Sequence, residues 1–158
     1  SRLLRGEAVE LSEVRLQNPR SAAARVTRHR LQGSAAPNAR ILVASATQTP
    51  LPSTGADWVV LSFLADLVPD ARLLAREARR LLRPGGGLAL VTAFNYQHGD
   101  LLTYYAPEEL LAVLGAEGLA VEDAVWVDHP HLFSPASVKS SRYLALRVVA
   151  RAVASPGP

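Results

Sequence analysis

Apolar positions between residues 57 and 94 form two short continuous runs, separated by a stretch with helical periodicity. Residues 58–64 are apolar at nearly every position and rich in β-branched and aromatic side chains, which is typical of a strand buried on both faces. From Asp70 onward apolar residues recur on one stripe, until Pro84 and the glycines after it end the predicted helix. Residues 88–94 repeat the strand pattern. The succession predicts a right-handed βαβ crossover with two parallel strands.

The alternation of strand and helix patterns continues on both sides of this crossover. Upstream, we expect a short strand over residues 7–10 that ends in an acid, a helix over residues 21–32 and a strand over residues 40–44. Downstream, Pro107 and the two glutamates after it indicate the first turn of a further helix.

The last part of the chain predicts a pair of strands. Residues 119–127 and 142–149 are strand-like and are joined by a proline-rich loop, so we expect them to pair antiparallel. The whole alternation predicts a three-layer α/β domain over residues 1–153, followed by a disordered tail over residues 154–158.

Composition narrows the class of protein. Of the 158 residues, 49% are hydrophobic and 20% are charged, close to an ordinary soluble globular protein. No apolar run approaches the roughly 20 residues of a membrane helix, so we expect no membrane partner. Cysteine is absent, which excludes disulfides and thiolate metal sites and favours an intracellular location, in the cytoplasm or an organelle matrix.

Charge is unevenly distributed along the chain. Residues 1–56 carry a net charge of +5, residues 57–131 carry −6 and residues 132–158 carry +4. The simpler interpretation is a set of solvated helix faces. The alternative is an arginine-rich surface between Arg15 and Arg40 that binds phosphate or an acidic partner. No aromatic residue lies in that stretch, so stacking on nucleic-acid bases is not expected.

Two histidine-containing loops are candidates for chemistry. His98 follows the second buried strand and is the residue there whose pKa suits proton transfer near neutrality, so it is the candidate catalytic residue. The alternative is a polar surface loop with a chance histidine. His129 and His131 stand two residues apart, but no third ligand is evident nearby, so we expect no metal site.

Three segments resemble the class I, seven-stranded S-adenosylmethionine-dependent methyltransferases. Residues 49–60, TPLPSTGADWVV, are similar to the family segment LPFPDGSFDVV, and residues 78–86, ARRLLRPGG, are similar to its helix end evaRvLkPGG. Residues 105–119 resemble the family helix written eel..ll..aGf. The likeness covers residues 7–150 and implies a Rossmann-like, mostly parallel sheet with helices on both faces and a C-terminal antiparallel strand pair.

The resemblance implies cofactor-binding positions for S-adenosylmethionine. Glu10 stands where the family has an acid that accepts hydrogen bonds from the ribose hydroxyls, although a solvated strand-end glutamate is the alternative. Ser45 and Ala46 stand where the family often has Asp-Ala beside the adenine, and serine can accept a hydrogen bond without the charge. Ser62 and Phe63 end the first buried strand, where the family forms its methyl-donor pocket, and packing in the core is the alternative for Phe63.

The acceptor is expected at the end of the second buried strand. Asn95 and Tyr96 follow that strand directly, and Tyr104 precedes the next helix, so these three are candidate substrate residues. For Tyr104 the alternative is packing against that helix. The residues do not distinguish a small molecule, a protein or an RNA as the acceptor.

The family's first strand and glycine-rich turn have no counterpart in residues 1–6, SRLLRG. In the family that strand is central in the sheet. Without it, the strands that normally flank it would keep unpaired buried backbone groups, at a cost of roughly 1–3 kcal/mol each. We therefore expect the domain to be incomplete at its N-terminus, with the missing strand supplied by an upstream segment or by a partner chain.

The leading hypothesis from the sequence is an enzyme that transfers a methyl group from S-adenosylmethionine to an unidentified acceptor. The alternative is a catalytically inactive relative, kept as a structural or assembly subunit of a larger complex, with or without RNA. The absence of the family's glycine-rich loop, Ser45 in place of an acid and the basic net charge favour this alternative. A nicotinamide-dependent Rossmann enzyme is disfavoured, because it too needs a glycine fingerprint.

Overall fold

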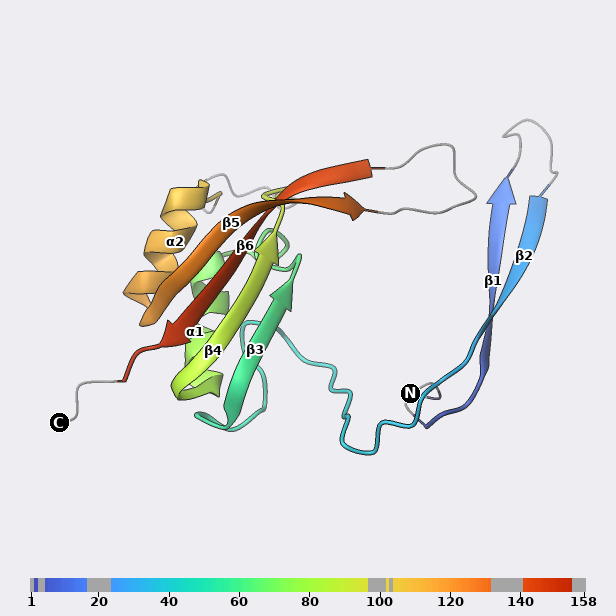
Figure 1. The fold of residues 1–158 in the computed structure, drawn as a ribbon, viewed down its shortest axis with the longest axis horizontal. Helices are drawn as coiled ribbons and strands as arrows, with labels where there is room; N and C mark the ends of the chain where they lie inside the picture. Colours follow the sequence, from blue (N-terminus) through green and yellow to red (C-terminus); the bar gives the residue numbers. More distant parts are fainter. Residues whose placement is uncertain are drawn as a thin grey trace. The chain divides into compact units, whose positions relative to one another are not determined.

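The computed structural model describes residues 2, 5–16, 24–96, 102, 104–131 and 141–154 (Figure 1). Backbone contacts divide the chain into two compact units, Ser1–Val43 and Ala44–Pro158. In the parts of the chain just given, no helix is long and apolar enough to cross a bilayer.

The first unit contains a two-stranded antiparallel sheet. Strand β1 (Val9–Leu16) pairs with β2 (Ala24–Leu31). The expected helix over residues 21–32 is therefore wrong for residues 24–31, while residues 21–23 lie outside the described residues. This segment includes the β-branched pair Val26 and Thr27, and it pairs with β1 along its whole length, which satisfies the backbone groups on that side.

The expected strand over residues 40–44 is also not formed. Ile41, Leu42 and Val43 are 66%, 53% and 97% exposed. A strand needs a neighbour that pairs with its N–H and C=O groups, and no described segment pairs with these residues.

The second unit contains a four-stranded mixed sheet of order β3-β4-β6-β5. Its strands are β3 (Ala56–Ser62), β4 (Leu82–Thr92), β5 (Leu119–His131) and β6 (Ser141–Ala152). Strands β3 and β4 are parallel, whereas β6 is antiparallel to both β4 and β5 (Figure 1). The predicted parallel pair and the predicted C-terminal antiparallel pair are both confirmed.

Two helices connect these strands, and each begins as its sequence predicts. Helix α1 (Ala71–Leu81) is capped by Asp70, whose Oδ1 accepts the Arg72 N–H at 2.7 Å. Helix α2 (Pro107–Ala116) begins with proline, and Glu109 accepts the Ala106 N–H at 2.7 Å.

Both helices pack on one face of the sheet and form a single core with it. Leu74 of α1 and Leu110 of α2 are each 2% exposed and belong to the same cluster as Leu88 and Leu90 of β4. Alternate residues of a strand face opposite sides, so Leu88 and Leu90 point to the helices, and Ala89 lies on the other face. The α/β class is confirmed, and the two described helices account for one of the two expected helical layers (Figure 1).

Candidate functional site

The two parallel strands end at the same edge of the sheet, each followed by a phenylalanine with an unusual backbone. Phe63 directly follows β3 and has a φ of +50°, and Phe94 lies two residues beyond β4 with a φ of +54°. Bulky residues rarely adopt positive φ, at a cost of order 1–3 kcal/mol, and such strain clusters at functional sites. Ligands of open α/β sheets bind beyond the carboxyl ends of the strands. We refer to this edge, at the ends of β3 and β4, as the carboxyl edge.

A buried carboxylate links the two strand ends. Asp66 lies in the segment after β3 and is 4% exposed. Its Oδ2 accepts the main-chain N–H of Asn95, which follows β4, at 2.9 Å. Its Oδ1 is buried and has no hydrogen-bond partner in the described part of the chain. Leaving a buried polar atom unpaired costs about 1–3 kcal/mol, so the carboxyl edge holds an acceptor with unused hydrogen-bonding capacity.

Aromatic rings surround this edge. We refer to the following residues as the aromatic cluster: Phe63, Phe94, Tyr96, Tyr104, Trp126 and His129. The Phe94 ring centroid lies 6.4 Å from that of Tyr96 and 5.9 Å from that of Trp126 on β5. Tyr96 stacks on Tyr104 at 4.5 Å, and Phe63 lies 5.0 Å from His129. These separations are those of favourable aromatic pairs.

Two tyrosine hydroxyls at this edge are committed to structure. The Tyr96 hydroxyl donates to the Tyr105 carbonyl at 2.9 Å, and the Tyr105 hydroxyl donates to Asp70 Oδ1 at 2.8 Å. Burial raises the pKa of Tyr96, and the charges of Asp66 and Glu109 act in the same direction. Burial also raises the pKa of Tyr105, with Asp70 adding to the effect. Both phenols are therefore protonated near neutral pH and act as donors rather than as bases.

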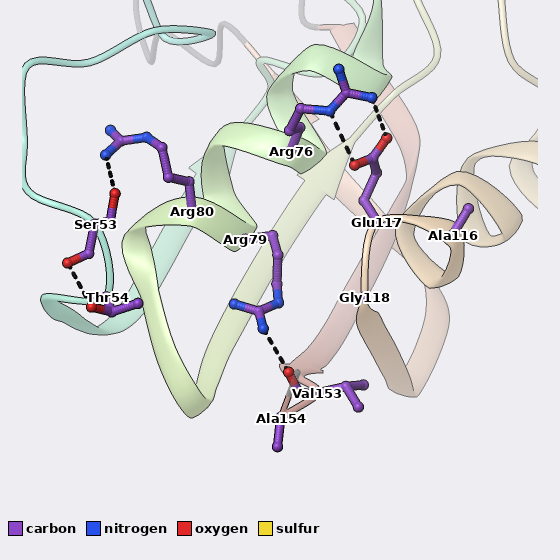
Figure 2. A pocket seen from close by; sticks show the side chains of 10 residues that line it. All are labelled: Ser53, Thr54, Arg76, Arg79, Arg80, Ala116, Glu117, Gly118, Val153 and Ala154. Carbon is purple, nitrogen blue, oxygen red and sulfur yellow. Dashed lines mark hydrogen bonds and ion pairs between the residues drawn. The ribbon is translucent and has the colours of Figure 1, made fainter. Parts of the chain in front are cut away.

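A hollow of about 600 Å³ lies at the opposite edge of the sheet, where β3, β4 and β5 begin (Figure 2). Arg76 donates to Glu117 at 2.9 and 3.2 Å, and Arg79 donates to the Val153 carbonyl at 2.7 Å. Arg80 donates to Ser53 Oγ at 3.0 Å. Figure 2 shows these arginines fastening α1 to the segments around it. Their guanidinium groups have structural acceptors, so the carboxyl edge remains the stronger candidate.

A smaller apolar cavity of about 120 Å³ lies beside β3. It is lined by Ala46, Thr49, Val59, Leu61, Leu74, Glu77, Ala78 and Leu81. Ligand pockets usually exceed roughly 300 Å³, so this cavity can hold only part of a ligand.

Comparison with known proteins gives the family. Residues 5–90, more than half of the chain, match a family described as "Methyltransferase domain". The chain belongs to this family. A comparison of this methyltransferase domain with curated proteins gives no match.

Solved structures share the fold of the methyltransferase domain at low sequence identity. A SAM-dependent methyltransferase from Methanosarcina mazei matches with a TM-score of 0.57 and 16% identity, over 78% of this chain and 70% of that one. One from Aquifex aeolicus matches with a TM-score of 0.51 and 19% identity, over 72% of this chain and 55% of that one. A complex of the Haloferax volcanii Trm112 methyltransferase activator with a methyltransferase matches with a TM-score of 0.57 and 14% identity, over 74% of this chain and 62% of that one. The family match confirms the predicted resemblance to methyltransferases, and the solved structures show that the fold is shared.

Five of the residues singled out from the sequence lie together at the carboxyl edge. Ser62 is exposed at the end of β3, and Phe63 follows it. Asn95 is joined to Asp66 as described above, and Tyr96 stacks on Tyr104. The candidate substrate residues and two of the candidate cofactor residues therefore share one edge of the sheet.

The other predicted residues lie elsewhere. Ser45 Oγ is within 3.0 Å of the Thr47 hydroxyl oxygen, and Ala46 packs partly buried against the core beside β3. Glu10 is exposed on β1 in the first unit, opposite Arg30 of β2. His98 lies outside the described residues.

Sequence reasoning missed Asp66, Phe94, Trp126 and the actual surroundings of His129. Asp66 carried one usable signal, because it is a lone acid among apolar residues just after a buried strand. Trp126 and His129 come from β5, and only the pairing of β5 with β6 brings that strand into this sheet. His129, considered earlier only as a metal ligand, packs in a tilted arrangement against Phe63.

Proposed function

We propose that this methyltransferase domain moves a methyl group from S-adenosylmethionine to an acceptor bound at the carboxyl edge of β3 and β4. The observation that carries the proposal is the strained pair Phe63 and Phe94, joined across the strand ends by the hydrogen bond from Asn95 to Asp66. When bound, S-adenosylmethionine supplies a methyl group on a sulfonium ion. Displacement at that carbon depends mainly on positioning, which a rigid strand edge provides.

We assign the cofactor to the β3 side of this edge. The Phe63 face at the edge would attract a cationic sulfonium. Away from the edge itself, the apolar Ala46 and the Ser45 hydroxyl suit an adenine ring with its amino group. Ser62, exposed at the strand end, offers a further hydroxyl. The assignment of Glu10 to the ribose hydroxyls stays a prediction from the sequence.

We assign the acceptor to the β4 side of the edge. Asn95, Tyr96 and Tyr104 lie together there, next to the buried Asp66. His98, which comes soon after these residues in the sequence, stays the predicted group that takes a proton from acceptors that must lose one.

Calorimetric titration of the 158-residue chain with S-adenosylmethionine tests the proposal. Micromolar affinity, about −8 kcal/mol, supports it. Phe63→Ala should weaken binding, whereas Leu67→Ala should not, because Leu67 is 49% exposed in the segment after β3 and outside the aromatic cluster. Absence of binding, with no transfer of labelled methyl to any acceptor, would favour the inactive structural subunit instead.

We further propose that an additional strand pairs with the free edge of β3. Within the described residues, β3 is the outermost strand of its sheet and pairs with β4 alone. An open edge presents unpaired N–H and C=O groups that favour strand addition. Either a segment outside these 158 residues or a partner chain can supply the strand. The Haloferax volcanii complex is a case in which a similar fold is bound to an activator protein.

A further inference from the structure

The apolar cavity beside β3 indicates what kind of strand the free edge of β3 accepts. We propose that the additional strand comes from a further segment of this protein, outside the 158 residues, and that it places one leucine-sized side chain in the cavity. The inference rests on the additional strand proposed above and narrows it to a strand of stated chemistry.

The cavity lies on the side of β3 that faces away from β4. Helix α1 supplies four of the eight lining residues, β3 supplies Val59 and Leu61, and the segment before β3 supplies Ala46 and Thr49. Of the described residues that line it, none belongs to β4. Val59 and Leu61 pack toward the core but are only half-buried, because no described strand flanks them on this side. A strand added to the edge would therefore pass beside the cavity.

The two polar residues that line the cavity already have partners. The Thr49 main-chain N–H and hydroxyl donate to Glu77 Oε1 at 2.8 and 2.6 Å, and Arg80 donates to both carboxylate oxygens of Glu77 at 2.7 Å. The other lining residues are alanine, valine and leucine. A polar side chain would give up water on entering such a space, so the cavity favours an apolar one.

The volume of the cavity limits the size of that side chain. The cavity measures about 120 Å³. An engineered apolar cavity of about 150 Å³ holds a benzene molecule. A branched aliphatic side chain fits the smaller space, whereas an aromatic side chain, with a methylene group in addition to its ring, exceeds it. Leucine matches both the size and the chemistry.

The alternation of side chains along a strand defines the positions next to this leucine. Alternate residues face opposite sides of a sheet, so only every second residue of the added strand can point toward the cavity. The residues between them would lie beside Trp58 and Val60, which are 49% and 72% exposed on the other face. Uncharged β-branched side chains suit these positions.

The solved structures that share this fold are longer than the part that this chain matches. The chain spans 70% of the Methanosarcina mazei structure and 55% of the Aquifex aeolicus structure. Chains with this fold thus hold segments beyond those matched here, and we assign the strand to such a segment. A second copy of this chain is the competing occupant, and the experiment distinguishes the two.

NMR titration of the isotope-labelled chain with four capped peptides tests the inference. The peptides have the sequence KTTTXTTTK, in which X is alanine, leucine, asparagine or phenylalanine. We expect the leucine peptide to bind at least about tenfold more tightly than the alanine peptide, because it removes three more carbons from water. Asparagine has the shape of leucine and should bind no better than alanine. Phenylalanine should bind about fivefold or more weakly than leucine. Amide shifts should change on β3 and not on β5, the outermost strand at the other side of the sheet.

Leu61→Ala enlarges the cavity and is the decisive variant. It should raise the affinity of the phenylalanine peptide at least to that of the leucine peptide, a reversal that a general loss of stability cannot produce. Val60→Ala is the matched control, because Val60 lies on the same strand and points to the opposite face, so the order of the four peptides should persist. If Leu61→Ala does not fold by circular dichroism, Val59→Phe replaces it. Its ring occupies the cavity, and leucine should then lose its advantage over alanine.

Binding that does not depend on X, or a leucine preference that persists in the cavity variants, would overturn the cavity assignment and leave the additional strand standing. Absence of binding at β3 by every peptide would overturn both. Sedimentation velocity tests the competing occupant: a dimer that the leucine peptide does not dissociate would place a second copy on the edge, against this inference. Calorimetry with S-adenosylmethionine on the same samples decides the methyl transfer separately, because it does not depend on the order of the peptides.

Discussion

The Trp58 indole on β3 lies directly against Gly87, its partner on β4, so closely that a Cβ at position 87 would stand 2.4 Å from the ring. Arg151 of β6 covers the same ring, with its guanidinium carbon 4.9 Å from the ring centroid. Three neighbouring strands are thus tied together on the face opposite the helices. The absence of a side chain at Gly87 is what allows this contact.

Gly87→Ala should therefore displace the indole. We expect a loss of about 1–3 kcal/mol in the free energy of unfolding, because the backbone of a central strand can yield little. The measurement is urea denaturation, followed by tryptophan fluorescence. Gly115→Ala is the control: no atom lies within 4 Å of its Cβ position in α2, so alanine should stabilise the helix by about 1 kcal/mol. Equal effects of the two variants would contradict this account.

Glu77 should make the stability of the domain sensitive to acid. It is buried on α1 and accepts hydrogen bonds from the Thr49 N–H at 2.8 Å, the Thr49 hydroxyl at 2.6 Å and Arg80 at 2.7 Å. The Arg80 hydrogen bond, helped by Thr49, lowers the pKa of Glu77 from 4.5 to about 2. The stabilisation is full above pH 4.5 and is lost as the pH falls through about 2.

We expect this one group to remove about 3 kcal/mol of unfolding free energy between pH 4.5 and pH 2. Glu77→Gln should be less stable than the native chain at pH 7 and should lose correspondingly less across that window. Denaturation curves at four pH values measure both. Glu108→Gln, which changes an exposed residue of α2, is the control. Its unfolding free energy should depend on pH as that of the native chain does. A Glu77→Gln profile parallel to the native one would show that Glu77 is not the titrating group.

The contact between Asp70 and Tyr105 should couple the start of α1 to the segment before α2. Asp70 Oδ1 accepts both the Arg72 N–H at 2.7 Å and the Tyr105 hydroxyl at 2.8 Å. We expect Tyr105→Phe to cost about 1 kcal/mol and Asp70→Ala, which also removes the helix cap, about 1–2 kcal/mol. A double-mutant cycle in urea should give a coupling of at least about 0.5 kcal/mol. Strict additivity would mean that the hydroxyl contributes nothing to the cap.

Local pattern was enough to predict the βαβ crossover, because the strands around Val59 and Leu90 and the helix between them each bury a periodic apolar set. It failed over β2, where three arginines and a histidine stand among apolar and hydroxyl side chains without strict alternation, and only pairing with β1 decides the conformation. Ser62, Phe63 and Asn95 were predicted at the site because strand ends are visible in sequence. The role of Asp66 could not be predicted, because an unfilled hydrogen bond depends on tertiary contacts.

The free edge of β3 should make the isolated chain prone to self-association, and Val60 offers the means to test it. Val60 is 72% exposed, and a lysine on an edge strand opposes pairing with another chain. We expect Val60→Lys to reduce the association seen by sedimentation velocity at high protein concentration, with a change in unfolding free energy within about 0.5 kcal/mol.

Leu144→Lys is the matched control for Val60→Lys. Leu144 is 63% exposed and lies on β6, opposite Asp128 of β5 and outside the stretch of β6 that pairs with β4. The control removes a similar apolar surface and adds the same charge, yet leaves the β3 edge intact, so it should associate like the native chain. If both lysines reduce association equally, exposed apolar area in general is responsible. In that case the proposal that β3 accepts an additional strand loses its support in solution.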